Sequence, residues 1–367
     1  MSINDLIIYI LVFFMILGAL DKCIGNKFGL GEKFDEGFKA MGPLAIAMVG
    51  VISLAPVLAD FLGKIIGPIY SFFGADPAMF APSFLAIDMG GYPLAVQMAQ
   101  TTEAGLFAGI ILGSMLGATV VFTIPVALNI IKKEDHKFLA IGVLTGLFTI
   151  PFGCLVGGLV AGFALKMILI NLIPIIIIAL LISLGLWLIP ATMIRGFRWF
   201  GQIVLIVITL ATAAIVTETL TGLVIIPGLA PIQDGIKVVG SITIVLLGTF
   251  PFIHVITKFF QKLLMKVGKI ININSESAAG LIVTLANNIP MFNMMKNMDD
   301  RGKVLNVAFT VSAAFVFGDH LGFTAAVSRP MIVPMIAGKL TAGFFAVILA
   351  YLLISRTNIL NPKQKVS

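Results

Sequence analysis

Long apolar segments recur along the whole 367-residue chain, and they constrain its fold more than any other feature. A helix needs roughly 20 mostly apolar residues to cross a bilayer. Hydrophobic residues make up 59% of the chain and charged residues 11%, against ~45–50% and ~25% in soluble domains. We therefore predict an all-α polytopic membrane protein with about eleven transmembrane helices, within a range of 10–12. The predicted spans are 3–20, 40–62, 78–99, 104–131, 138–163, 167–189, 200–226, 237–264, 276–295, 303–335 and 337–355.

The charge pattern indicates contact with lipid and not with nucleic acid. The formal net charge is +7, but Lys and Arg occur mainly in the predicted connectors, for example at Lys132, Lys133 and Arg195. Basic residues at such positions contact anionic lipid headgroups, so the lipid bilayer is the predicted partner. Cys23 and Cys154 have neither metal-ligand nor disulfide-framework spacing, and no metal or other cofactor is predicted. The acidic start of the chain and the lack of a cleavage site predict that the first segment is retained as a helix.

Three predicted spans contain sequences that a continuous helix does not accommodate. In the third span, Gly90 and Gly91 precede Tyr92-Pro93, and proline removes a hydrogen-bond donor and restricts the residue before it. The ninth span has Asn287-Asn288-Ile289-Pro290 at the corresponding place, and the tenth has Phe317-Gly318-Asp319-His320. Unwound backbone inside a bilayer needs polar partners from protein or water. These sequences therefore predict discontinuous helices around a substrate site.

Three pairs of short sequence matches, which occur in the same order, predict an internal repeat. If the first copy holds five spans, the second enters the membrane in the opposite sense, which is the inverted-repeat architecture of many secondary transporters. The predicted repeat halves are about 1–163 and 167–355, within a single transmembrane transport domain, 1–367. Chance similarity among helices rich in Gly and Phe is the alternative interpretation. The matched segments are 37–42 with 196–201, 90–93 with 287–290, and 117–123 with 318–324.

Few acidic residues lie well inside the predicted spans, and each one is costly there. A carboxylate at the centre of a spanning helix costs on the order of 2.5–3.5 kcal/mol. Asp88 and Asp319 adjoin the predicted breaks, so each either serves the substrate site or is a structural partner of the interrupted backbone. Asp60 lies one helical turn from Lys64, which predicts an ion pair. Glu218 is either a functional acid or an acid that reaches the membrane interface.

Small residues at regular spacing predict two faces for close helix packing. One is the segment 153–162, and the other is formed by Gly109, Gly113 and Gly117. Small side chains let membrane helices approach closely. We expect both faces to pack within the monomer, and a homo-oligomer interface is the alternative.

Seven sequence motifs, spread over nearly the whole chain, together resemble one known family. They are FDEGFKAMG (34–42), LAPVLA (54–59), IDMGGYPLA (87–95), VVFTIPVAL (120–128), IPFGCLVGGLVAG (150–162), KVLNVAF (303–309) and FGDHLGF (317–323). These motifs are similar to those of the ethanolamine permeases encoded with bacterial ethanolamine-utilisation enzymes. The resemblance implies a transporter and not an enzyme, a multi-pass protein of the bacterial inner membrane that admits ethanolamine to the cytoplasm. It transfers no established binding residue to a position in this chain.

The chemistry of ethanolamine suggests which residues would bind it. Its protonated form is a small cation with one hydroxyl, so its site should offer a carboxylate, carbonyl groups at helix breaks and an aromatic face. His320 could orient Asp319, carry a proton or bind substrate, and a structural hydrogen bond is the alternative. The predicted substrate-binding residues are Asp88, Tyr92, Asn287, Asn288, Thr119, Thr123, Asp319 and His320. The predicted gating or coupling residues are Glu218, Gln97, Gly90 and Gly91.

The mechanism of transport stays open at this point, and so do two other functions. The lack of a GxxxxGK(S/T) motif argues against ATP-driven transport within this chain, whereas facilitated diffusion and ion-coupled uptake both fit. The main alternative is a Na⁺- or H⁺-coupled symporter of another small amine or amino acid, with Arg329 the one arginine considered as a partner for a carboxylate. An intramembrane aspartyl protease is a distant alternative, because the usual Tyr-Asp and Gly-x-Gly-Asp signatures are absent.

Overall fold

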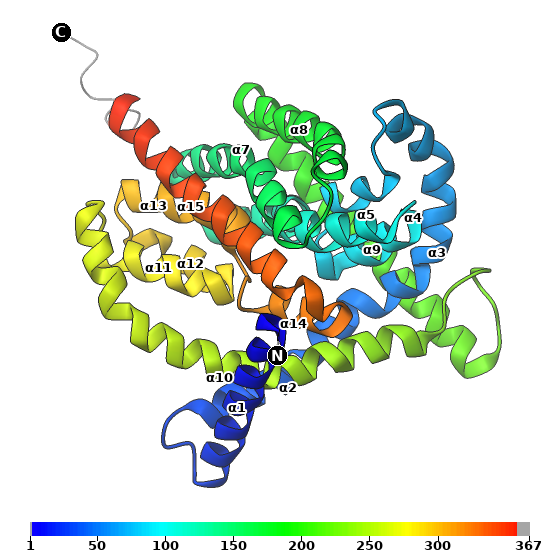
Figure 1. Ribbon diagram of the computed structural model, residues 1–367, viewed down its shortest axis with the longest axis horizontal. Helices are drawn as coiled ribbons and strands as arrows, with labels where there is room; N and C mark the ends of the chain where they lie inside the picture. Colours follow the sequence, from blue (N-terminus) through cyan, green and yellow to red (C-terminus); the bar gives the residue numbers. More distant parts are fainter. Residues whose placement is uncertain (1, 358–367) are drawn as a thin grey trace.

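The computed structural model describes residues 2–357, apart from the side chains of residues 191, 260–267, 269, 356 and 357. Within that part of the chain, every regular element is a helix (Figure 1). Eight helical stretches are long and apolar enough to cross a bilayer. This supports the predicted all-α polytopic class, but it does not confirm the predicted count of about eleven transmembrane helices.

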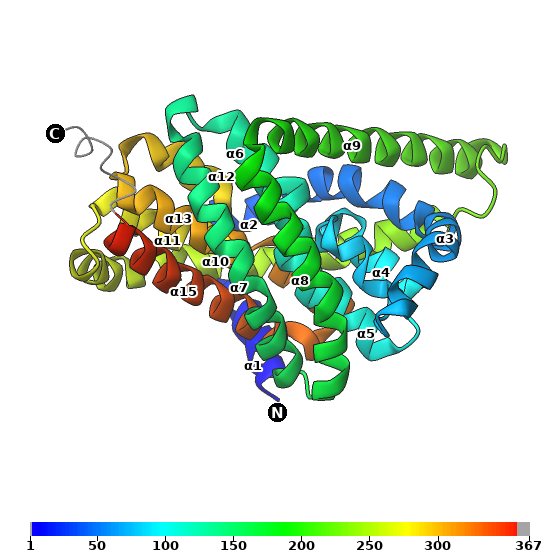
Figure 2. The same ribbon diagram turned by 90° about the horizontal axis from the view of Figure 1, so that it is seen from above.

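The eight spanning stretches make up most of the described chain. The first four are α1 (Ile3–Cys23), α2 with α3 (Leu30–Lys39 and Met41–Phe72), a composite helix of α5, η4, η5 and α6 (Thr102–Leu106, Phe107–Gly117, Thr119–Thr123 and Ile124–Ile130), and η6 with α7 (Lys133–Asp135 and His136–Val160). The others lie in α8 (Leu165–Leu188), in α9 (Pro190–Thr221), in α10 (Ile232–Ile270), and in η8 with α15 (Arg329–Met331 and Ile332–Thr357). Figure 2 shows α9 along one edge of the molecule.

The remaining three predicted spans are interrupted, which explains the lower count. Residues 78–99 form short turns and one short helix: η1 (Pro77–Met79), η2 (Ala81–Ser83), η3 (Ile87–Gly91) and α4 (Tyr92–Met98). Residues 276–295 divide into α11 (Ser275–Ala286) and α12 (Asn288–Met294), followed by η7 (Met295–Asn297), and residues 303–335 divide into α13 (Asp300–Ala313), α14 (Asp319–Val327) and the start of the last span. The chain leaves helical geometry close to the three places that the sequence indicated.

The first interruption depends on glycine. Gly90 has a φ of +100°, a conformation that residues with a β-carbon rarely adopt. The Gly91 N–H donates to the carbonyl oxygen of Ala86 over 2.9 Å, so this backbone donor is satisfied. The composite helix lies directly against the interrupted chain, because a β-carbon on Gly117 would come within 2.0 Å of the Leu85 carbonyl oxygen.

The other two interruptions lie side by side, and backbone hydrogen bonds join them. The N–H of Phe315 donates to the carbonyl oxygen of Thr284 over 3.1 Å, and the N–H of Phe317 donates to that of Leu285 over 2.9 Å. Unwound backbone can therefore exist at membrane depth here, because protein supplies the partners that lipid cannot.

Close packing of α7 on α15 joins distant parts of the chain (Figure 1). A β-carbon on Gly153 would lie 2.6 Å from the carbonyl oxygen of Gly338, and one on Gly157 would lie 3.0 Å from that of Pro334. The predicted small-residue face at 153–162 thus packs within the monomer, at an approach that only glycine permits.

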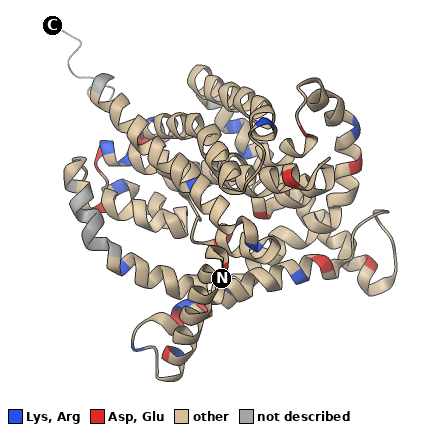
Figure 3. Ribbon diagram, viewed as in Figure 1, with Lys and Arg blue, Asp and Glu red and all other residues tan. Residues whose placement is uncertain are grey.

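The outer faces of α8 and α9 are apolar and exposed. Leu181 and Trp187 on α8 are 62% and 72% exposed, and Leu210 on α9 is 62% exposed. Figure 3 shows that charged residues are sparse and that long stretches of helix carry none. Such surfaces suit acyl chains, as a multi-pass membrane protein requires.

We expect Gly117→Ala to destabilise the protein because the added carbon would collide with backbone at the first interruption. Overpacking of this kind costs about 1–3 kcal/mol, which would lower the unfolding temperature of the detergent-purified protein. Gly63→Ala is the matched control, because a β-carbon there meets nothing within 4 Å. Equal unfolding temperatures for the two variants would contradict the close approach.

Candidate functional site

The three interrupted segments meet at one cavity of about 420 Å³. Its wall is completed by the start of α3, the composite helix and α10. The lining residues are Ala40, Pro43, Leu44, Ala47, Ala86, Asp88, Met89, Ala118, Phe122, Phe250, Asn287, Ile289, Phe315, Asp319 and His320. Four of the predicted substrate-binding residues, from separate parts of the chain, are therefore brought to a single space.

Two carboxylates and a histidine give this cavity its polar character. Asp88 comes from the first interruption, and Asp319 begins α14 after the third. Both are partly buried, and both line the same cavity. Among the side chains that the structure describes, neither has a basic nitrogen within 4.0 Å. The two acids therefore face the cavity without a direct ion-pair partner.

His320 and Asn287 hold different positions at the same cavity. His320 is 2% exposed, and its ring lies 5.1 Å from the ring of Phe315, centre to centre. Its Nδ1 atom has no hydrogen-bond partner among the described residues. The Asn287 side chain caps α12, because its Oδ1 accepts the N–H of Ile289 over 2.9 Å, which leaves its amide nitrogen for other contacts.

Phenylalanines form the aromatic part of the cavity wall. Phe122, Phe250 and Phe315 line it, and the rings of Phe122 and Phe315 meet edge to face at 5.6 Å. The sequence analysis predicted Tyr92 for this role, but Tyr92 does not line the cavity and instead packs edge to face on Phe323 at 5.4 Å. Apolar phenylalanines are abundant in this chain, so nothing in the sequence distinguished these three.

The predicted binding residues Thr119, Thr123 and Asn288 are buried in helix contacts and do not line the cavity. The Thr119 hydroxyl lies 2.8 Å from the carbonyl oxygens of both Met115 and Val311. The amide of Asn288 donates to the hydroxyl of Thr123 over 3.1 Å. Both contacts tie the composite helix to the interrupted segments of the other half of the chain, which is a structural use of these groups.

Lys339 is a residue that the sequence analysis missed. It lies on α15, is 1% exposed, and its Nζ donates to the carbonyl oxygen of Ser114 over 2.5 Å. It forms no direct ion pair with an acid among the described side chains. It lies near the start of the predicted span 337–355, and the cost of buried charge was applied to acidic residues alone.

Comparison with known proteins identifies the family. The model of the ethanolamine utilisation protein family, EutH, matches residues 3–353. The chain belongs to the EutH family.

Relatives within this family are similar over nearly their whole length. A probable ethanolamine permease EutH of Listeria monocytogenes is 62% identical over 356 residues, which cover 97% of this chain and 95% of that one. A probable ethanolamine permease EutH of Escherichia coli is 49% identical, with 97% of each chain covered. An uncharacterized protein, YxeR, of Bacillus subtilis is 50% identical, with 94% of each chain covered. No solved structure matches the chain.

The predicted gating and coupling residues of this EutH family member are dispersed. Gly90 and Gly91 form the first interruption beside the cavity. Gln97 is exposed near the end of α4, and Glu218 lies near the end of α9 with its Oε2 atom unpaired among the described residues. Neither of these two lines the cavity, and their roles stay predictions. Asp60, by contrast, forms the expected ion pair, with its Oδ2 atom 2.7 Å from the Nζ of Lys64.

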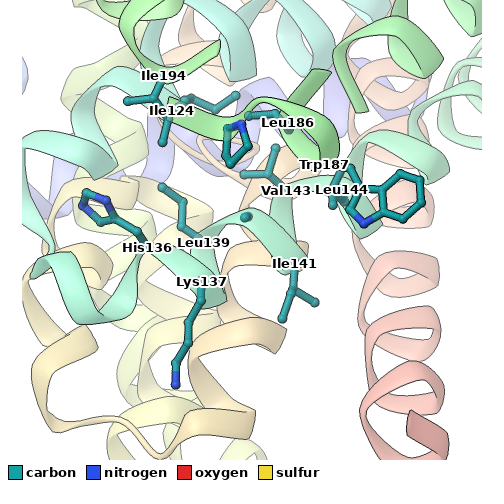
Figure 4. A pocket seen from close by; sticks show the side chains of 12 residues that line it. Ile124, His136, Lys137, Leu139, Ile141, Val143, Leu144, Leu186, Trp187 and Ile194 are labelled. Carbon is teal, nitrogen blue, oxygen red and sulfur yellow. The ribbon is translucent and has the colours of Figure 1, made fainter. Parts of the chain in front are cut away.

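A second cavity, of about 400 Å³, lies between α7 and the α8–α9 junction (Figure 4). Its walls are mostly apolar, and its only charged or titratable lining residues are His136 and Lys137. It offers no acid among those lining residues, so it cannot give an ammonium group a counter-charge. The cavity between the interrupted segments is therefore the candidate site.

We expect Thr123→Val to lower the unfolding temperature of the purified protein. Loss of the hydroxyl leaves the buried amide of Asn288 without its acceptor, at a cost of about 1–3 kcal/mol. Thr209→Val is the control, because the Thr209 hydroxyl is exposed and bonds only to its own helix, at Leu205. A purely local role for Thr123 would give both variants the same unfolding temperature.

Proposed function

We propose that this chain is a transporter that mediates ethanolamine uptake across the bacterial inner membrane. Its family and the names of its relatives support this function. The observation that carries the proposal is the convergence of Asp88 and Asp319 on one cavity with no direct ion-pair partner among the described side chains. Carboxylates without a direct ion-pair partner in a low-dielectric site attract a cation strongly.

The composition of the cavity fits each part of the substrate. The ammonium group of ethanolamine takes the position between the carboxylates of Asp88 and Asp319. The phenylalanine rings of the wall offer faces that attract an ammonium group. The hydroxyl group can accept from the free amide nitrogen of Asn287, whose Oδ1 is occupied by the α12 cap. The N-terminus of α14 favours the negative charge of Asp319 in its first turn.

Two matched contacts support the predicted inverted repeat. A β-carbon on Gly117 would lie 2.0 Å from the carbonyl oxygen of Leu85, and one on Gly318 would lie 2.1 Å from that of Ala286. The glycines and the carbonyls are the same number of residues apart along the chain. Halves at about 1–163 and 167–355, within one transport domain, would place an interruption from each half beside the cavity, as alternating access requires.

The main alternative substrate, an amino acid, needs a cation for its carboxylate. Arg329, the arginine considered for this role, is exposed and does not line the cavity. The site therefore favours an amine without a carboxylate.

Uptake into proteoliposomes with and without imposed Na⁺ or pH gradients distinguishes facilitated diffusion from ion-coupled transport.

We expect Asp88→Asn and Asp319→Asn each to reduce the apparent affinity for ethanolamine. Loss of a charged hydrogen-bond partner costs about 1.5–3 kcal/mol, which is about 10- to 100-fold in affinity. The measurement is uptake of labelled ethanolamine into proteoliposomes at matched protein content. Asp60→Asn is the control, because that acid is exposed and paired with Lys64. Uptake by both site variants at the level of Asp60→Asn would refute the proposed function of the cavity.

We expect Phe122→Leu to weaken ethanolamine uptake while it preserves the apolar volume of the wall. The substitution removes a ring face whose attraction for a cation is worth about 0.5–2 kcal/mol. The effect should appear as a higher substrate concentration at half-maximal uptake, with the maximal rate much less changed. Phe148→Leu on α7, where the ring is 58% exposed, provides the control. Identical concentration dependence in the two variants would exclude an aromatic contribution at Phe122.

A further inference from the structure

We propose that Lys339 is the resident counter-cation of the cavity, and that it makes the site selective for amino alcohols with a single positive charge. The inference rests on the proposed function and deepens it, because it specifies which amines the site accepts. It also assigns a role to a residue that does not itself line the cavity.

The burial of Lys339 is the first observation. An ammonium group that is removed from water needs hydrogen-bond acceptors and a counter-charge. The carbonyl oxygen of Ser114 supplies one acceptor at 2.5 Å. The structure describes no carboxylate within 4.0 Å of the Nζ atom, so we assign its counter-charge to a more distant acid.

The packing around Ser114 shows which acid this is. Ser114 lies in η4, whose eleven residues are all buried. A β-carbon on the adjacent Gly113 would lie 3.4 Å from Ile87, the residue before Asp88. The hydrogen bond from Lys339 to Ser114 therefore places its ammonium group near the first interruption, and we assign Asp88 as its counter-charge. Asp88 lines the cavity, whereas Lys339 does not.

The net charge of the site then indicates how many positive charges its substrate should carry. On this proposal Asp88 and Asp319 are ionised, Lys339 is protonated and His320 is neutral, which gives two negative charges and one positive charge. The empty site has one net negative charge, and one protonated amine completes its neutrality. A doubly protonated diamine would leave an uncompensated positive charge in a poorly solvated space, which is costly. The site should therefore accept 3-aminopropanol and reject 1,3-diaminopropane, which has the same chain length but a second ammonium group.

The test compares these two ligands on the wild-type protein and on variants that change the charge count. Ligand-induced shifts in unfolding temperature, measured on purified protein, report binding without requiring transport. We expect 3-aminopropanol to bind wild type about tenfold or more tightly than the diamine. Lys339→Met raises the net negative charge to two, and we expect it to reduce or reverse this preference. Lys64→Met is the control, because Lys64 is exposed and paired with Asp60.

A double variant separates a charge-balancing role from a merely structural one. Asp88→Asn alone leaves a net charge of zero, and we expect it to bind 3-aminopropanol poorly. Asp88→Asn with Lys339→Met returns the net charge to minus one, and we expect it to bind 3-aminopropanol several-fold more tightly than Asp88→Asn does. This comparison decides the inference even if Lys339→Met alone gives no folded protein.

The outcomes distinguish this inference from the proposed function. If Asp88→Asn is impaired but the double variant binds no better, or if Lys339→Met keeps the wild-type preference, Lys339 does not balance charge and the inference fails alone. If Asp88→Asn binds 3-aminopropanol as wild type does, the cavity is not the amine site and the proposed function fails first. Restored binding in the double variant supports both.

Discussion

The structure depends on one constraint: a polar group inside a bilayer must find its partner within the protein. Continuous helices meet this requirement automatically, and they form the lipid-facing parts, such as α8 and α9. The interruptions would be unstable there, and they occur instead where other segments supply hydrogen bonds. The bonds from Phe315 and Phe317 to the end of α11 are the clearest example. The interruptions therefore gather in the interior, and the acidic residues beside them gather with them around one cavity.

Glycine allows the interrupted segments to pack in the interior. Neighbouring helices must lie directly against the interrupted backbone to shield its polar groups from lipid, and glycine has no side chain to prevent this. Gly117 lies directly against the carbonyl of Leu85, and Gly153 lies against that of Gly338. The first contact packs the composite helix against the first interruption, and the second packs α7 against α15. Because α15 also carries Lys339, the same close packing places this buried side chain against the Ser114 carbonyl of the composite helix. The packing of α7 against α15 thus contributes to the stability of the fold and also fixes the position of Lys339.

Local chemistry explains which features the sequence could predict. Proline, glycine pairs and asparagine pairs disturb a helix wherever they occur, so the interruptions near 90, 287 and 317 were visible without a structure. The cost of a buried carboxylate similarly singled out Asp88 and Asp319, and helical spacing predicted the pair of Asp60 with Lys64. The structure does not confirm the predicted count of about eleven transmembrane helices, because hydropathy alone does not register a break in backbone geometry. The phenylalanine wall and the contact of Lys339 with Ser114 depend on tertiary packing, which no local pattern encodes.

On the proposed function, the substrate is itself part of the electrostatic structure. Asp88 and Asp319 belong to different proposed halves, and each would attract the same ammonium group. A bound cation would therefore link the two halves, whereas in the empty site the two carboxylates repel each other across the cavity. A ligand shifts a conformational equilibrium only through its different affinity for the two states. A site whose acids come from opposite halves meets this condition, because movement of one half relative to the other changes the distance from the cation to one of its counter-charges. On the proposed charge balance, Lys339 limits the repulsion that remains when the site is empty, which would let the unloaded transporter make the same movement.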